Sequence, residues 1–188
     1  FYIGTSPFAT AHIAYLLHGI ENTEAKQIVS KSVEFLEQLD YTGKRIYKYW
    51  YGNTTGTAFP LLPIDLDDTS VVNQVLALQK RKTADPEILL NNRNSKQQFY
   101  TWLKPSVKTL LKHPSLFSVF AEYRKMYHIF LKNSDNLRMA EYNDTEIIVR
   151  MNVYIMLAVM DKEMAVAEKH FPFTLADTET ELQSSLHY

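Results

Sequence analysis

Three aspartates stand within four residues of one another near the middle of the chain. Asp65, Asp67 and Asp68 belong to the stretch DLDDTSVVNQVLAL, in which an apolar helical pattern follows directly after the carboxyl groups. Protonating an alkene or an epoxide requires a carboxyl that still holds its proton, and both burial and neighbouring carboxylates raise the pKa of a carboxyl. This spacing is therefore compatible with an acid that starts a carbocation reaction.

The same three residues also suit the start of a helix. Aspartate is a preferred N-cap, and further acidic residues in the first turn interact favourably with the helix dipole. That dipole stabilises a carboxylate and lowers its pKa, which opposes the acid role. The spacing alone leaves both interpretations open, an acid site and a helix cap.

The amino-acid composition excludes several classes of protein and of functional site. The chain has 188 residues, 46 % of them hydrophobic, which is enough for one domain with a sizeable core. Its 20 basic and 21 acidic residues are balanced, so we expect no nucleic-acid partner. Cysteine is absent, which excludes disulfides, thiolate nucleophiles and cysteine-bound zinc. No apolar run approaches the roughly 20 residues of a membrane span and no signal peptide is visible, so we expect a cytoplasmic protein.

Scarce glycine and recurring apolar spacing predict an all-α fold. The first two helices should begin at Pro7, capped by Ser6, and at Thr23. The acidic helix should run from about Asp67 to about Lys82. Further helices are expected over 85–104 (a short one, then an aromatic one ending before the proline at 105), 113–133, 144–163 and 163–171. The pattern of 144–163 is apolar almost all round and predicts a buried helix.

Three of the expected helices follow one template. Residues 6–17, 65–76 and 146–157 each begin with a polar residue, continue as strongly apolar, and precede a more amphipathic helix. This alternation predicts helical-hairpin repeats, with an inner ring of helices wrapped by an outer one. We expect a single toroid-like domain over 1–188 with an insertion around 105–140. A complete ring needs about six hairpins and the chain supplies about four, so we expect an incomplete α/α barrel. It would be a fragment, a domain completed by a second domain or subunit, or a reduced toroid that no longer cyclises.

The order of these segments resembles a known family. SPFATAHIAYLL, FLEQLDYTGKRIYKYW, DLDDTSVVNQVLAL, FYTWL and IIVRMNVYIML are similar to the α/α toroid of terpenoid cyclases and protein prenyltransferases. DLDD followed by Thr looks like the DxDD motif of class II terpene cyclases. The resemblance implies that Asp67 is the general acid, that Asp65 and Asp68 support it, and that the substrate is an isoprenoid. The prenyltransferase branch is excluded because its zinc site requires a cysteine.

Other candidate residues would bind the substrate. Lys44 and Arg45 in TGKRIYKYW are candidate ligands for a diphosphate, although surface solvation explains such a charge run as well. Candidate lining residues are Trp50, Trp102 and His12, for which core or rim packing is the alternative. No metal ligand is assigned. A diphosphate substrate would require Mg²⁺. The acidic residues that could lie near it are Glu141, Asp144 and Glu146, for which helix capping is the alternative.

A competing hypothesis is a non-catalytic helical scaffold that binds an apolar ligand or a partner protein. An acid site predicts that Asp67 is buried in an aromatic-lined cavity and hydrogen-bonded to Asp65 or Asp68. A scaffold predicts that all three carboxylates are exposed or cap the helix. A glycan-processing toroid would need paired carboxylates about 5 to 10 Å apart across an open cleft, which adjacent aspartates on one helical turn fit poorly.

Overall fold

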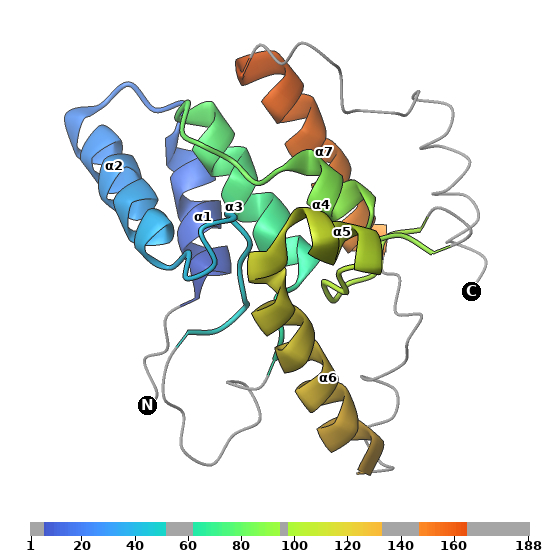
Figure 1. Ribbon diagram of the computed structural model, residues 1–188. Helices are drawn as coiled ribbons and strands as arrows, with labels where there is room; N and C mark the ends of the chain where they lie inside the picture. The colour runs from blue at the N-terminus through green and yellow to red at the C-terminus, as the bar shows by residue number, and fades with distance from the viewer. Residues whose placement is uncertain (1–5, 52–61, 95–97, 133–146, 165–188) are drawn as a thin grey trace.

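The computed structural model describes residues 6–51, 62–94, 98–132 and 147–164 (Figure 1). Within these ranges the fold is all-α, and pairing of extended backbone is limited to isolated bridges. The regular elements are α1 (Pro7–Leu17), α2 (Thr23–Gln38), α3 (Leu66–Leu78), α4 (Pro86–Leu90), α5 (Val107–Lys112), the 3-10 helix η2 (Pro114–Leu116), α6 (Phe117–Lys132) and α7 (Ile147–Glu163). The expected helix at 163–171 lies almost wholly outside the described residues.

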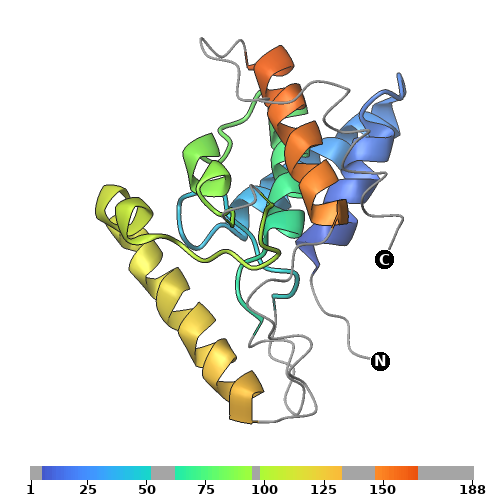
Figure 2. The same cartoon turned by 90° about the vertical axis from the view of Figure 1, so that its right-hand side faces the viewer.

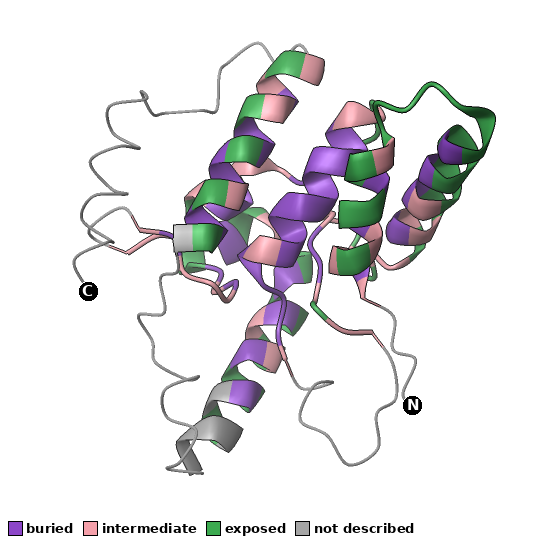
Figure 3. Ribbon diagram, turned by 180° about the vertical axis from the view of Figure 1, so that it is seen from behind, coloured by how far each residue is buried: buried purple, intermediate pink, exposed green. Residues whose placement is uncertain are grey.

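The three helices that share the sequence template lie next to one another. α3 packs between α1 and α7, and all three run in the same direction, so their N-termini meet at one end of the layer (Figures 1 and 3). α2 returns antiparallel against α1. α6 projects beyond this layer, as the rotated view shows (Figure 2). Chemistry placed at the start of α3 is therefore flanked by the beginnings of two parallel helices.

Local signals set several helix boundaries as predicted. Ser6 caps α1 by accepting a hydrogen bond from the Ala9 N–H at 3.4 Å, and α2 begins at Thr23. α3 ends at Leu78, earlier than predicted, because Lys80 adopts the left-handed conformation (φ 52°). The backbone N–H groups of Lys80 and its successor then turn back to carbonyls of the last helical turn, as in a Schellman-type ending.

The predicted aromatic helix before the proline at 105 is wrong. Residues 98–104 are extended, and their backbone pairs with the segment that precedes α3. The N–H of Leu66 donates to the carbonyl of Thr101 at 2.8 Å, and the N–H of Leu103 donates to Ile64 at 2.9 Å. Phe99 and Leu103 are both buried and lie four residues apart, a spacing that also fits a helix, so their burial alone does not indicate extended backbone. This extended segment fixes where α3 begins.

The second wrong prediction concerns α7, which was expected to be buried all round. One side packs into the core, but Ile148, Met151 and Ile155 on its other side are between 41 % and 58 % exposed (Figure 3). No described helix is both long enough and apolar enough to cross a membrane.

α3 is the centre of the hydrophobic core. One cluster of buried residues joins it to α1 and α2, and a second joins it to α4, α5, α6 and α7. Because both sides of α3 are covered, its polar side chains are buried too and need partners. Thr69 accepts a hydrogen bond from the Tyr47 N–H at 3.0 Å, and Gln74 donates to the Asn152 carbonyl at 3.1 Å.

Asn73 is the most heavily bonded of these buried groups. Its amide donates to the carbonyls of Arg45 at 2.8 Å and Thr69 at 2.7 Å, and its oxygen accepts from the Ala84 N–H at 2.7 Å. The side chain is fully buried and so replaces water for three backbone groups. It ties the loop before α3 to the chain that follows it.

We expect Asn73→Ala to lower the free energy of unfolding by about 2–4 kcal/mol, because it leaves buried backbone groups without partners. Denaturant unfolding measures this change. Lys31→Ala, at an exposed position of α2, is the control and should change stability by less than about 0.5 kcal/mol. Equal effects of the two substitutions would contradict the role assigned to Asn73.

Candidate acid site at the start of α3

Asp65 caps α3. Its backbone is extended (φ −119°, ψ 161°), and its carboxylate accepts a hydrogen bond from the Asp68 N–H at 2.7 Å. The capping interpretation is therefore confirmed for this residue. Asp65 is only 5 % exposed, however, because the backbones of Tyr47 and Trp102 pair with it on either side. An N-cap carboxylate is usually solvated, whereas this one is enclosed.

Asp68 is buried more deeply, at 2 % exposure. Its Oδ1 accepts no hydrogen bond from any donor in the described part of the chain, and it is the one buried side-chain atom of α3 in that position. Burial raises the pKa of Asp68 far above its usual range, and the charge of Asp65 raises it further. A hydrogen bond between the two carboxyls adds to this effect, since only protonated Asp68 can donate it.

Asp65 and Asp68 therefore behave as one titrating pair. Burial also raises the pKa of Asp65, while the hydrogen bonds from the Asp68 side chain and backbone lower it again. The charge of Asp67 raises the pKa of both buried carboxyls. The environment thus favours one proton held between the two buried carboxyls at neutral pH, with Asp68 as the donor and Asp65 as the acceptor.

Asp67 has a different partner. It is half-buried, and its Oδ1 accepts a hydrogen bond from the Asn152 side chain of α7 at 2.6 Å. The carboxyl pairing lies between Asp65 and Asp68, so the expected contact of Asp67 with either neighbour is replaced by this bond across helices. Sequence analysis missed Asn152. The available signal was a polar residue within the apolar run IIVRMNVYIML.

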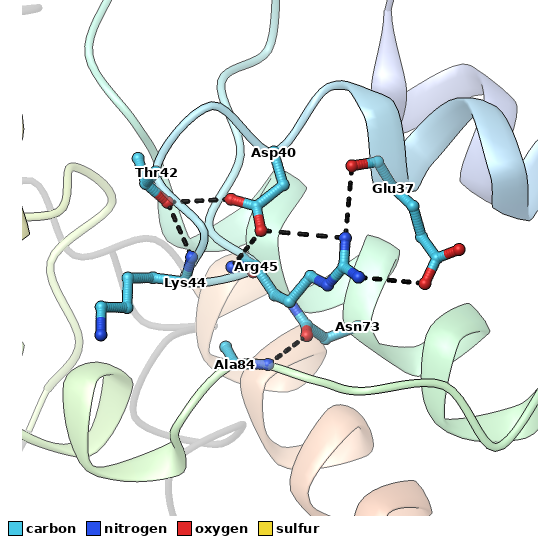
Figure 4. Close-up of polar contacts among 7 residues, drawn as sticks. All are labelled: Glu37, Asp40, Thr42, Lys44, Arg45, Asn73 and Ala84. Atoms are coloured by element: carbon cyan, nitrogen blue, oxygen red, sulfur yellow. Dashed lines mark hydrogen bonds and ion pairs between the residues drawn. The ribbon is translucent and has the colours of Figure 1, made fainter.

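The basic residues predicted to bind a diphosphate lie in the loop before α3. The Arg45 guanidinium bonds to Glu37 at 3.0 Å and lies 3.8 Å from the Asp40 carboxylate (Figure 4). The Arg45 backbone is left-handed (φ 58°) and its N–H donates to Asp40 at 3.0 Å. Its charge is therefore compensated within the loop. The Lys44 side chain extends away from this network (Figure 4). Diphosphate binding by either residue stays a prediction.

The structure separates the three predicted lining residues. The Trp102 backbone pairs with that of Asp65, beside the carboxyl pair. Trp50 lines a cavity near α6, and His12 is exposed on α1 with its ring 4.3 Å from that of Phe8. Glu141, Asp144 and Glu146 lie outside the described residues. Within the described ranges, no cluster of three or more His, Asp or Glu residues is arranged to hold a metal ion.

Comparison with known proteins identifies no family: no family model, no curated protein and no solved structure matches the chain. The chemistry of the site is therefore argued from its own geometry.

Asp68→Asn should change how stability depends on pH. The folded state retains a proton on Asp68 that the unfolded chain releases above about pH 3.8, its ordinary pKa. Fewer protons are then bound in the unfolded state, so this residue lowers the stability of the folded protein as pH rises. The contribution is at most about 1.4 kcal/mol per pH unit for one whole proton. Asparagine keeps a donor toward Asp65 but carries no titrating proton.

Asp68→Asn and the parent should therefore be closest in stability near about pH 3, and the variant should be more stable near about pH 7. Denaturant unfolding across this range tests it, with the exposed first-turn substitution Glu24→Gln as the control. If the variant keeps the parent's pH slope, Asp68 does not hold the proton.

The bond between Asp67 and Asn152 should appear as a coupling energy. In a double-mutant cycle of Asp67→Ala and Asn152→Ala, we expect about 1–3 kcal/mol of coupling in unfolding free energy, as for a hydrogen bond to a charged group. The pair Asp67→Ala and Lys31→Ala should be additive within about 0.5 kcal/mol. Additivity in the first cycle would show that the two side chains do not interact in solution.

Proposed function

We propose that the chain is a class II terpene cyclase-like protein that initiates cyclisation of an isoprenoid by protonation. The observation that supports this most is the buried Asp68 carboxyl, which lacks a donor on one oxygen and shares a proton with Asp65. A carboxyl that stays protonated near neutral pH is the requirement for protonating a carbon–carbon double bond. A helix cap alone needs only Asp65.

The three aspartates have different roles in the proposed reaction. Asp67 is proposed as the general acid, as the family resemblance implies; its side chain is half-buried and bonded to Asn152, so it needs a proton from the buried pair. Its O–H bond breaks, and the π electrons of the alkene form the new C–H bond. A second double bond of the substrate attacks the resulting cation and closes the ring. Asp67, left as a carboxylate, takes a proton from the buried Asp65–Asp68 pair. The proton lost by the product cation returns to that pair and restores the starting charge of the cluster.

The proposed cation requires aromatic surfaces near the cluster. Trp102 flanks Asp65 through its backbone, and its side chain packs beside Tyr123 and Met126. Aromatic faces stabilise cations, and exclusion of water prevents their capture. Lys44 and Arg45 are the proposed contacts of a diphosphate group, with Mg²⁺ required if the substrate carries one.

The arrangement of helices is compatible with part of a toroid. α1, α3 and α7 are parallel neighbours, as inner-ring helices would be, and α2 returns outside α1. The exposed apolar side of α7 is where further hairpins of the ring, or a second domain or subunit, would pack. The insertion assigned to 105–140 includes α5 and α6. Completion of the ring is part of this proposal.

A non-catalytic scaffold is the second candidate. It is favoured by the fact that Asp65 caps α3 and Asp67 is engaged by Asn152, so two of the three carboxylates have structural partners. In that case the carboxyl cluster serves only to join α3 to α7. The two functions differ in whether an organic product forms.

Product analysis decides between them. The chain, and any longer natural form of it, are incubated with Mg²⁺ and farnesyl diphosphate, geranylgeranyl diphosphate or squalene, and extracts are analysed by gas chromatography and mass spectrometry. We expect a cyclic product whose rate falls by about 10²–10⁴-fold in Asp67→Asn, because general acid catalysis is lost. Asp85→Asn, which alters the cap of α4 away from the cluster, should retain activity. Absence of a cyclic product from the longer form with every substrate would favour the scaffold.

A further inference from the structure

A cavity lies apart from the aspartate cluster, between the loop after α2 and the side of α6. Its volume is about 370 Å³, within the range of small-molecule sites. The described residues that line it come from the end of α2, the loop and α6, and are Gln38, Leu39, Tyr41, Lys48, Trp50, Tyr51 and Glu122. Three of the seven are aromatic, and three others carry an amide or a charge.

The two charges in this cavity compensate each other. The Lys48 ammonium lies 2.6 Å from the Glu122 carboxylate, and the Tyr41 hydroxyl donates to the same carboxylate at 3.1 Å. Lys48 also lies 5.2 Å from the centre of the Tyr41 ring, where a cation is favoured. The lining therefore offers no net charge to attract an anion or a second cation. It favours a neutral ligand.

A purely apolar ligand fits the cavity poorly. Covering Lys48 and Glu122 with hydrocarbon would remove water from two charged groups without replacing its hydrogen bonds. Hydroxyl groups replace those bonds, because a carboxylate accepts, an ammonium donates and the Gln38 amide does both. The lining thus suits a ligand that has hydroxyl groups along its edge.

The same ligand also needs an apolar face. The Lys48 ammonium lies over the Tyr41 ring, so Trp50 and Tyr51 are the other aromatic residues of the lining, and Trp50 has the larger ring system. The Tyr49 ring stacks beside Trp50, with ring centres 6.3 Å apart and planes 27° from parallel. Tyr49 is 40 % exposed, so the aromatic surface continues outward from the cavity. A flat, amphipathic ring with hydroxyl groups at its edge matches this arrangement.

We propose that this cavity binds a neutral pyranose sugar, with the C–H face of the ring on Trp50 and its hydroxyl groups on Gln38, Lys48 and Glu122. No reaction is assigned to the site, because Glu122 is the only carboxyl in its described lining and sugar hydrolysis uses two. The proposal does not depend on the function of the aspartate cluster.

Tryptophan fluorescence tests it, because the chain has only two tryptophans and one lines the cavity. In the Trp102→Phe background, Trp50 is the sole reporter. Glucose, galactose, mannose, N-acetylglucosamine and cellobiose are titrated to about 50 mM, above the millimolar dissociation constants of weak sites. We expect a saturable change of emission with at least one of them. No saturable change with any of the five would overturn the proposal, and so would saturation by sodium diphosphate or tetramethylammonium alone.

A matched pair of substitutions on α2 locates the binding. Gln38→Ala removes an exposed amide that lines the cavity, and Gln27→Ala removes an exposed amide elsewhere on the same helix. We expect Gln38→Ala to weaken sugar binding by about tenfold and Gln27→Ala to leave it unchanged, since one hydrogen bond is lost only in the first case. Both positions are exposed, so neither variant should fail to fold. Equal affinities of the two variants would place the sugar outside this cavity.

Discussion

The structure depends on the burial of α3 from both sides. Most of α3 is buried between two hydrophobic clusters, so the buried polar residues on it need partners within the protein. Thr69, Asn73 and Gln74 meet this requirement by bonding to the loop before α3, the chain after it and α7. These bonds hold irregular segments in place without a sheet. The polar residues of α3 therefore organise the fold as much as its apolar ones do.

Asp68 is the exception on this helix, because one of its buried carboxyl oxygens has no hydrogen-bond donor in the described part of the chain. A buried carboxyl oxygen without a donor disfavours the charged form, because nothing replaces the water that would solvate it. Asp65 is then both a helix cap and the acceptor of the retained proton. The cap and acid interpretations of the DLDD stretch are therefore compatible, since one aspartate meets the demands of the helix and another is freed from them. Spacing alone does not distinguish these roles, because they are set by the flanking extended segments.

Much of the helical layout was predictable from residues whose effect is local. Ser6 with Pro7 specified the start of α1, and the common template anticipated that α1, α3 and α7 are neighbours. The errors arose where distant backbone decides the outcome. Phe99 and Leu103 lie four residues apart, which fits a helix as well as a strand, and the segment around Ile64 that pairs with theirs lies far back in the chain. Likewise, the hydrogen bond from Asn152 to Asp67 joins residues 85 positions apart, so no local sequence pattern predicts it.

The segment from Arg45 to Tyr51 faces two parts of the molecule at once. Its first half carries the Tyr47 backbone that pairs with Asp65 and Thr69, and its second half supplies Lys48, Trp50 and Tyr51 to the cavity beside α6. A substitution in this segment therefore affects both regions, so a change that favours one region can be harmful to the other. Such a segment should diverge slowly among relatives that retain both regions. An insertion between Tyr47 and Trp50 would relax this constraint, because the two halves of the segment could then change independently.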